Sequence, residues 1–393
     1  MQRVAGPVEL DADWFAGAES AQTRAMPGGR VAVSCPAPFG VGGLGRHVRE
    51  IVEALQRRDA DVTYVCEASA PSHGSPAGAG SARGHEIAPS RAIATALSPL
   101  TRISPPVRMW AALAEFDRRA VRALGDPAAG GYEHLIAFTG AARHQLERAG
   151  ASPARPSLGL VSATTHIRTV LRRHELAYRQ YPLERSWAPL LAARTLDEYA
   201  HAQVIYVSSQ RVRESFLAEG EREERLIHFP LTPDRRFATA SASPQPAAAS
   251  DSFEIVYVGG LSVVKGVPLL VDALERLAHA DLRLVLVGGY GTRGMRRFIE
   301  RACARDQRIV VTLGDPLEHL RRASVYVHPS YDDGFGYSPA EALAARVPVI
   351  ATDSTGMADL ITPQRNGAIV PGGDVRALAE AIDAAYRGEL LRA

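Results

Sequence analysis

Short apolar runs alternate with amphipathic helical patterns along most of this chain, and this alternation is the feature that most limits its fold. Residues 30–35 read RVAVSC, which predicts a short buried strand, and apolar residues at helical spacing follow between Val48 and Leu55. A second strand, DVTYVC, is predicted at residues 61–66. A strand, a helix and a strand in this order predict parallel pairing in an α/β sheet, because parallel strands need a long crossover connection.

Further apolar runs continue this alternation through both halves of the chain. We expect strands at His134–Phe138, Ser157–Ser162, Val204–Val207, Phe253–Val258, Leu282–Val287, Ile309–Leu313, Val325–His328 and Val347–Ala351. Between residues 68 and 106, Ser, Ala, Gly and Pro are too frequent for elements to be placed, so a surface loop is predicted.

The pattern is interrupted at residues 231–252, which are rich in Ala, Ser and Pro and are typical of a linker. A chain of 393 residues is long enough for two domains. We expect Rossmann-like domains at residues 30–230 and 253–393, with a loose extension at residues 1–29. Two doubly wound domains would face a cleft at the carboxyl ends of their strands, where open α/β sheets bind ligands.

Composition and charge exclude several classes of protein. No apolar run approaches the roughly 18 residues of a membrane-spanning helix. The net charge of +2 offers no large field for nucleic acid. Cys35, Cys66 and Cys303 are widely separated, so neither a disulfide framework nor a zinc site is predicted. The N-terminus lacks the basic-then-apolar order of a signal peptide, and we expect a cytoplasmic protein.

A glycine-rich loop, GVGGLG at residues 40–45, matches the dinucleotide fingerprint G-x-G-x-x-G, and Glu67 lies about twenty residues further on, as that motif requires. An NAD-dependent dehydrogenase is therefore one hypothesis. Residues 36–39 separate the predicted strand from the glycines, whereas the fingerprint places its first glycine at the strand end. This separation favours a plain anion-binding loop at a helix N-terminus.

Lys265 is the only lysine among 45 basic residues. It lies in GGLSVVKG, between a predicted strand and an amphipathic helix, where a compact ammonium suits a diphosphate. A solvated cation before a glycine turn is the alternative interpretation, but the position and uniqueness of this lysine favour function.

Two further motifs follow predicted strands. In DDGFGYSPAE, the carboxylates of Asp333 and Glu341 flank a glycine-rich helix entrance and suit a ligand with hydroxyl and phosphate groups. As a structural alternative, Ser338 and Glu341 would form a capping box at that helix. His166 follows the strand at residues 157–162, and from position alone a surface or core role is the commoner one for a histidine.

From about Arg30 to Arg387 the chain resembles the family 4 glycosyltransferases, which have the two-domain GT-B fold and retain anomeric configuration. The resemblance is strongest in VYVGGLSVVKG, in VHPSYDDGFGYSPAEALAARVPVIAT and in NGAIVPGGD. It is weaker at residues 42–45 and at His166, while AEFDRRAVRAL and SATTHIR resemble one bacterial branch of the family.

The resemblance implies a transferase that moves a sugar from a nucleotide-diphosphate sugar to an acceptor hydroxyl of a natural product, glycan or lipid. It implies no cofactor and no obligatory metal, and we expect a UDP-sugar in preference to a GDP-sugar. By this similarity Glu341 would hold the ribose, Lys265 the diphosphate and Asp333 the donor sugar, with His166 beside the reacting sugar. Amides that would surround the sugar and the phosphates belong to Gly42, Gly43, Gly334, Phe335, Gly336, Tyr337 and Ser338.

The sequence departs from the family pattern in three places. Asp333 stands where the family usually has Glu, which shortens the carboxylate arm by one methylene. Gly260 stands where an arginine often shares the diphosphate, so Lys265 would carry more of that charge or Arg293 would substitute. The chain ends soon after Arg387, whereas family members usually continue into a further helix, and a truncated C-terminus is one interpretation of this difference.

Two other functions are compatible with the same residues. The same pocket would serve a sugar-nucleotide epimerase or a protein that binds the nucleotide without turnover. A basic face that would suit an anionic acceptor or a peripheral membrane contact comprises Arg168, Arg172, Arg173, Arg179 and Arg185. Because Glu175 and Glu184 are interspersed, a solvated helix face is the favoured interpretation.

Overall fold

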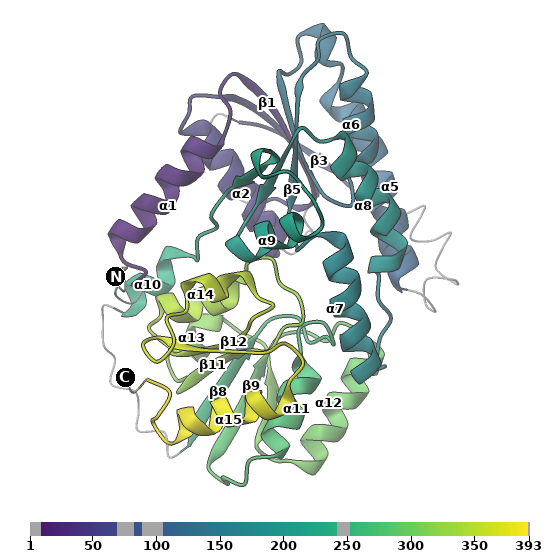
Figure 1. Cartoon of the computed structure of the whole chain (residues 1–393). Coiled ribbons are helices and arrows are strands. Elements are labelled where there is room, and N and C mark those ends of the chain that lie inside the picture. Colours follow the sequence, from purple (N-terminus) through teal and green to yellow (C-terminus); the bar gives the residue numbers. More distant parts are fainter. Residues whose placement is uncertain (1–8, 69–81, 89–104, 242–251, 392–393) are drawn as a thin grey trace. The chain divides into compact units, whose positions relative to one another are not determined.

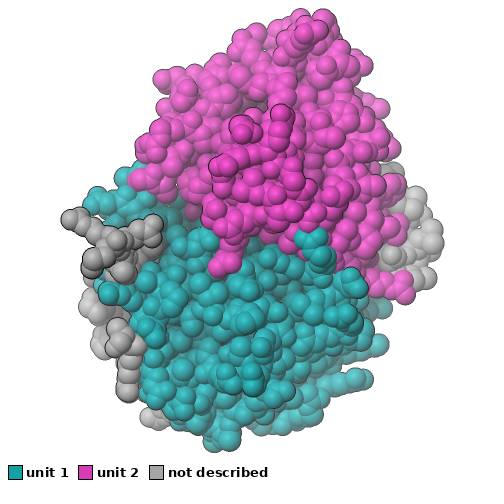
Figure 2. Space-filling model, in the orientation of Figure 1, with its two compact units in different colours: residues 1–16, 172–184, 232–393 teal, residues 17–171, 185–231 magenta. Residues whose placement is uncertain are grey.

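The computed structural model describes residues 9–68, 82–88, 105–241 and 252–391. The chain forms two compact units (Figure 2). Unit 1 comprises residues 1–16, 172–184 and 232–393, and unit 2 comprises residues 17–171 and 185–231. Each unit is built on a parallel sheet of its own, which confirms the α/β fold class with two Rossmann-like domains.

Unit 2 contains, among the described residues, a seven-stranded sheet in which every neighbouring pair is parallel (Figure 1). Its strands, in order across the sheet, are β3 (Arg83–Ile87), β2 (Asp61–Glu67), β1 (Arg30–Pro38), β4 (His134–Phe138), β5 (Ser157–Ser162), β6 (Val204–Val207) and β7 (Leu226–His228). Its helices are α2 (Gly42–Gln56), α5 (Pro105–Leu124), α6 (Arg143–Gly150), α8 (Ala188–His201) and α9 (Gln210–Ala218). The strand order reverses between β1 and β4.

Unit 1 contains, within the described part of the chain, a six-stranded parallel sheet. Its strands, in order across the sheet, are β10 (Ile309–Thr312), β9 (Leu282–Val287), β8 (Phe253–Val258), β11 (Val325–His328), β12 (Val349–Thr352) and β13 (Gly367–Val370). Its helices are α10 (Arg235–Ser241), α11 (Val267–Glu275), α12 (Arg293–Arg305), α13 (Pro316–Leu320), α14 (Tyr337–Ala344) and α15 (Val375–Tyr386). The strand order reverses between β8 and β11.

Three short 3-10 helices, in the described part of the chain, are η1 (Pro127–Ala129), η2 (Glu223–Arg225) and η3 (Gly356–Leu360). Helix α7 (Ile167–Gln180) begins within the residues of unit 2 and ends within those of unit 1. Its Ala177, and Tyr181 just beyond its end, belong to the apolar core of unit 1 together with residues of α11 and α15. The boundary between the units is therefore crossed within a helix as well as near the linker.

The N-terminal region differs from the loose extension that the sequence predicts for residues 1–29. Residues Ala12–Ala25 form helix α1, whose Phe15 is buried. Asp11 begins the helix by accepting a hydrogen bond from Trp14 N–H at 2.9 Å, and Gln22 Nε2 donates to Glu50 Oε2 at 2.7 Å. The helix was missed because alanines and charged residues dominate it, so its buried face has little apolar contrast.

Strands β3, β7 and β13 and helix α10 also lie where the sequence indicated no element. Strand β3 falls inside the predicted loop at residues 68–106, the rest of which, apart from the start of α5, lies largely outside the described residues. Helix α10 falls inside the predicted linker, of which residues 242–251 are likewise outside the described part. Strands β7 and β13 are only 3 and 4 residues long, and β7 is too short for a period-2 pattern to be recognised.

Candidate active site

Two loops at the carboxyl edge of the unit 1 sheet carry residues that the sequence singled out. Residues 259–266 follow β8 and include Lys265, and residues 329–336 follow β11 and include Asp333. Strands β8 and β11 are neighbours at the point where the strand order reverses, which is where open parallel sheets bind ligands. The topology alone thus brings these two residues to one edge.

The two loops are joined through their backbones. Tyr331 N–H donates to Val264 O at 2.8 Å, and the Ser330 hydroxyl donates to the same carbonyl at 3.2 Å. Gly266 has a φ of 73°, and a Cβ at this position would lie 1.8 Å from Pro329 O. Only glycine allows this approach, because any side chain would collide with a backbone atom.

Lys265, Asp333 and His328 meet at a single carboxylate oxygen. Asp333 Oδ2 accepts hydrogen bonds from Lys265 Nζ at 2.6 Å and from His328 Nε2 at 3.0 Å. Burial opposes ionisation of Asp333, but the Lys265 ammonium and the hydrogen bond from His328 outweigh it and hold the pKa below its usual range. Asp333 is therefore a carboxylate. Within the described residues, both of its side-chain hydrogen bonds go to Oδ2, and Oδ1 accepts none from another side chain.

His328 is a residue of this cluster that sequence reasoning missed. It lies at the end of β11, is buried, and stacks near the rings of Tyr257 and Tyr326 at centroid distances of 6.4 and 6.3 Å. Burial lowers its pKa, the Lys265 ammonium lowers it further, and Asp333 opposes both effects. The imidazole is neutral near pH 7 and donates from Nε2. The sequence feature that could have identified His328 is a histidine at the end of a predicted strand. The same kind of feature drew attention to His166.

Helix α14 begins beside this cluster. It starts at Tyr337, with Gly336 as the N-cap residue at a φ of 89° and no side-chain cap. Ser338 therefore lies in the first helical turn, and the alternative interpretation of a Ser338–Glu341 capping box is wrong. Glu341 is buried on α14. Burial is the main cause of the raised pKa of Tyr326 on β11, and the Glu341 carboxylate raises that pKa further, so the Glu341 carboxylate lies near Tyr326.

The segment between Asp333 and α14 is fixed by pairing with a neighbouring loop. Asp333 N–H donates to Ser354 O at 3.2 Å, Gly356 N–H donates to Asp333 O at 2.9 Å, and Met357 N–H donates to Phe335 O at 2.6 Å. Gly334 and Phe335 are buried in this pairing, while Tyr337 is half-buried and lies edge-on to Phe335.

Two charged residues of the predicted solvated helix face have structural partners instead. Arg173 pairs with Asp332, which is buried, at 2.8 Å between Nη1 and Oδ1. Glu184 accepts from Val263 N–H at 2.9 Å and from the Thr292 hydroxyl at 2.8 Å. The favoured interpretation is wrong for these two residues. Glu184 links the loop that carries Lys265 to the start of α12, where Arg293 is exposed.

The glycine-rich loop of unit 2 joins β1 directly to α2. Strand β1 extends to Pro38 and α2 begins at Gly42. The prediction that residues 36–39 separate the strand from the glycines is therefore wrong. That separation was the reason given against a dinucleotide fingerprint. Gly42 has a φ of 66°, and a Cβ at Gly45 would lie 2.0 Å from Pro38 O. Gly42 and Gly43 are the first residues of the helix, where backbone N–H groups lack intrahelical acceptors.

His166 lies just before α7 and is 6% exposed. Its Nδ1 accepts from Arg168 N–H at 3.3 Å, and its ring packs against Tyr199 and Phe216 at centroid distances of 4.9 and 5.1 Å. The structure thus groups Lys265, Asp333 and the start of α14 within unit 1, whereas Gly42, Gly43 and His166 belong to unit 2.

The described residues contain neither a metal-binding cluster nor a membrane-spanning helix. Among them, no group of three or more His, Cys, Asp or Glu side chains is arranged to hold a metal ion. Within the same residues, no helix has the length and apolar character needed to cross a membrane.

Residues 240–393 match the family model described as Glycosyl transferases group 1. Over 148 residues the chain is 30% identical to the capsular polysaccharide biosynthesis glycosyltransferase CapM of Staphylococcus aureus, covering 36% of this chain and 39% of CapM. It is 32% identical over 145 residues to the D-inositol 3-phosphate glycosyltransferase of Xylanimonas cellulosilytica, 34% of each chain. The chain thus matches little more than a third of the length of these relatives.

Solved structures resemble the whole chain. Sucrose-phosphate synthase of Thermosynechococcus elongatus has a TM-score of 0.64 at 19% identity, covering 93% of this chain and 92% of its own. Anabaena HepE, solved in complex with UDP-glucose, has a TM-score of 0.61 at 17% identity, covering 92% and 91%. Identities this low show the fold alone. Residues 240–393 therefore match the group 1 glycosyltransferases, and the two parallel-sheet units have the fold of these solved structures.

Proposed function

We propose that this protein transfers a sugar from a nucleotide-diphosphate sugar to an acceptor hydroxyl and retains the anomeric configuration. The observation that carries the proposal is the placement of the chain's only lysine, with Lys265 Nζ 2.6 Å from Asp333 Oδ2 at the switch point of the unit 1 sheet. UDP is the expected nucleotide, since HepE was solved with UDP-glucose and an E. coli trehalose-6-phosphate neighbour with UDP-2-fluoro glucose.

In this proposal Lys265 neutralises the diphosphate. Breaking the bond between the anomeric carbon and the phosphate oxygen builds negative charge on the leaving group, and a fixed cation stabilises that charge without reorganisation. Asp333 holds the ammonium in place before the donor arrives. Asp333 Oδ1, which accepts no hydrogen bond from a described side chain, is then the atom that accepts a hydrogen bond from a donor-sugar hydroxyl.

The start of α14 supplies the neutral donors in this proposal. The N–H groups of Tyr337 and Ser338 lie in the first turn, where no intrahelical carbonyl can accept from them, and the partial positive charge of the helix end favours phosphate oxygens. Pro339 follows without an N–H, so the helix loses no hydrogen bond there. Glu341, on the same helix, would hold the ribose hydroxyls.

The acceptor side of the proposal involves unit 2. The donor phosphate takes the proton of the attacking hydroxyl on the face from which the leaving group departs, which accounts for retention. His166 would lie beside the reacting sugar, and the amides of Gly42 and Gly43 would lie near the phosphates. We propose that no metal is required, and transfer measured with and without EDTA tests this.

A thermal-shift panel tests the proposed donor site. UDP should raise the unfolding midpoint more than GDP, ADP or dTDP, since binding to the folded state alone stabilises it. The same panel on Lys265→Ala should show a much smaller shift with UDP. Stabilisation by NAD(H) and by none of the nucleoside diphosphates would overturn the proposal in favour of a dehydrogenase. Product analysis with and without an acceptor separates transfer from epimerisation.

A further inference from the structure

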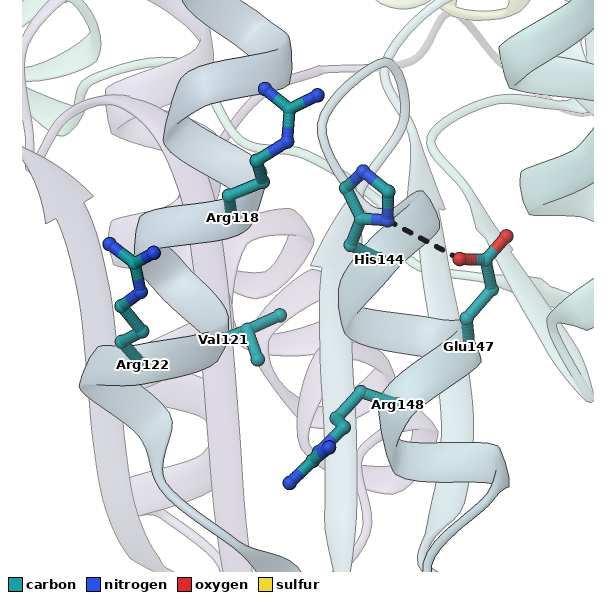
Figure 3. A pocket seen from close by; sticks show the side chains of 6 residues that line it. All are labelled: Arg118, Val121, Arg122, His144, Glu147 and Arg148. Atoms are coloured by element: carbon teal, nitrogen blue, oxygen red, sulfur yellow. Dashed lines mark hydrogen bonds and ion pairs between the residues drawn. The ribbon is translucent and has the colours of Figure 1, made fainter.

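A basic groove lies between helices α5 and α6 of unit 2 (Figure 3). It has a volume of about 450 Å³ and is lined by Arg118, Val121, Arg122, His144, Glu147 and Arg148. Small-molecule sites typically have volumes of about 300–1,000 Å³, so the groove is large enough for a small ligand or for part of a larger one. None of its residues has a role in the proposed transfer reaction.

Three guanidinium groups line this groove and have no ion-pair partner among the described residues. Arg118 and Arg122 project from successive turns of α5, and Arg148 projects from α6 (Figure 3). All three residues are exposed, and none forms an ion pair with any other residue that the structure describes. By contrast, the adjacent Arg119 lies 3.8 Å from Glu115 and donates to Ala88 O at 2.6 Å. The groove therefore concentrates cations that the fold itself does not use.

The carboxylate in the groove lining does not neutralise them. Glu147 is held by Arg143, with 2.9 Å between Nε and Oε1, and by His144, with 3.3 Å between Nδ1 and Oε2. Although burial opposes its ionisation, these partners lower the pKa of Glu147, so it stays charged and paired. An anion that enters the groove would meet Arg118, Arg122 and Arg148 with their charges uncompensated.

The two helices that carry these arginines are held rigidly by buried carboxylates. Asp117 on α5 accepts from the N–H groups of His144 and Gln145, at 2.9 and 3.2 Å. Glu198 on α8 accepts from the N–H groups of Ala142 and Arg143, at 2.9 and 3.2 Å. Arg194 pairs with both carboxylates, and all three side chains are buried. The start of α6 is thereby capped from two sides.

This capping has two consequences for the groove. It fixes α6 relative to α5, so the three guanidinium groups are presented on a preorganised frame and a ligand does not have to order the helices. It also occupies the backbone N–H groups at the start of α6, so those amides are not available to an external anion. Recognition in the groove would therefore depend on the arginine side chains.

We propose that this groove binds a water-soluble ligand that carries phosphate or diphosphate groups. Guanidinium groups donate paired hydrogen bonds that match phosphate oxygens, and three of them around one hollow suit a ligand with more than one anionic oxygen pair. Val121, which is half-buried, is the one apolar residue among those that line the groove, whereas a membrane-binding surface adds several large apolar side chains to its cations. The recess therefore favours a dissolved ligand over a lipid surface. The proposal is independent of the transfer reaction.

Calorimetric titration of inorganic pyrophosphate into the Lys265→Ala protein tests this proposal, because that background removes the ammonium of the proposed donor site. Replacing one arginine from each helix, Arg118→Gln with Arg148→Gln, should weaken pyrophosphate binding by at least about tenfold, since each charge-assisted hydrogen bond lost is worth about that factor. The matched control is Arg58→Gln with Arg108→Gln. It removes the same charge from exposed positions of unit 2 outside the groove and should change the affinity by less than about twofold.

The readings of this titration are decisive in both directions. Loss of binding in the groove variant with retention in the control supports the site, provided that both variants unfold at the midpoint of the parent. Equal affinity in the two variants overturns it. Absence of pyrophosphate binding in the parent also overturns it, and if phosphatidylglycerol vesicles then bind the parent and not the groove variant, the patch is a membrane surface. Because every protein in the test lacks Lys265, a failure of the proposed donor site leaves the result unchanged.

Discussion

Lys265 is held on Asp333 before any ligand arrives, so its contribution can be isolated by substitution. We expect Lys265→Ala to abolish transfer and Lys265→Arg to lower kcat/KM by at least about tenfold, because a planar guanidinium does not reproduce a compact ammonium that bridges a carboxylate and a diphosphate. Steady-state kinetics with a UDP-sugar measure this, with Arg108→Gln as the control. Wild-type kinetics in Lys265→Arg would show that the identity of the cation is irrelevant.

A substitution at Glu341 distinguishes a role in ligand binding from a role in packing. We expect Glu341→Gln to weaken UDP binding by about tenfold while the thermal unfolding midpoint changes little, because the amide keeps the shape of the side chain and loses the charge that accepts from ribose hydroxyls. Calorimetric titration and thermal unfolding are to be measured on the same sample. An equal loss of affinity and stability would instead assign Glu341 to the fold.

His47 predicts a pH dependence of stability in unit 2. It is buried on α2 between Phe138 and Phe229, its Nε2 has no hydrogen-bond partner within the described structure, and burial lowers its pKa to about 3. A histidine in the unfolded chain has a pKa of about 6.5. Between these two values the unfolded state binds a proton that the folded state does not. The free energy of unfolding therefore falls as the pH is lowered, by about 1.4 kcal/mol per pH unit for this group.

Urea unfolding between pH 7 and pH 4.5 measures this dependence. We expect His47→Met to remove the part of the slope that His47 contributes, because an apolar side chain takes up no proton on unfolding. The difference between wild type and variant isolates His47 from the other titrating groups. If both proteins lose stability in parallel as the pH falls, His47 is not a source of the acid sensitivity.

At the scale of elements, the loops after β8 and β11 depend on one glycine. We expect Gly266→Ala to destabilise unit 1 and to weaken UDP binding together, because its Cβ would lie 1.8 Å from Pro329 O and its φ is 73°. The loop that carries Lys265 would then be displaced from Asp333. Thermal unfolding with and without UDP measures both effects.

Gly260 is the matched control in the same loop. Nothing lies within 4 Å of a Cβ built there, so Gly260→Ala should leave the unfolding midpoint and UDP binding close to those of the wild type. If the two variants behave alike, close contact between the loops does not position Lys265.

The central strands were predictable from sequence, and the peripheral elements were not. Strands β8, β9 and β11 are mostly apolar and mostly buried, so their limits were predicted to the residue. Strand β3 lies at the edge of its sheet, and four of its five residues are exposed. An edge strand is stabilised by backbone pairing more than by apolar burial. Its residues therefore do not form the apolar run by which a buried strand is recognised.

The candidate site shows the same division. Lys265, Asp333 and Glu341 could be found because a strand, a glycine turn and a helix start are visible in sequence. The contact of His328 with Asp333 depends on a short loop folding back onto its own strand, and that of Arg173 with Asp332 joins residues 159 positions apart. Neither contact leaves a periodic pattern of residues in the sequence from which it could be predicted.

At the scale of the whole molecule, the near-absence of lysine makes Lys265 chemically addressable. We expect an amine-directed acetylating reagent to modify only Lys265 and the N-terminal amine, because the chain contains no other primary amine. The Lys265 side chain is 36% exposed, so the reagent can reach it. Saturating UDP should slow modification of Lys265 and leave the N-terminal amine unaffected, as measured by peptide mass spectrometry. Equal labelling rates with and without UDP would place the nucleotide elsewhere.

Helix α7 makes the boundary between the units differ from a simple division of the chain. Because Ala177 and Tyr181 complete the core of unit 1, a fragment cut at the linker and beginning near residue 252 would lack part of its own interior and expose apolar surface in solution. Exchanging unit 1 between related enzymes would likewise require joints on both sides of residues 172–184. Recombination at the linker alone would transplant the proposed donor site without residues 172–184, which complete the core of unit 1.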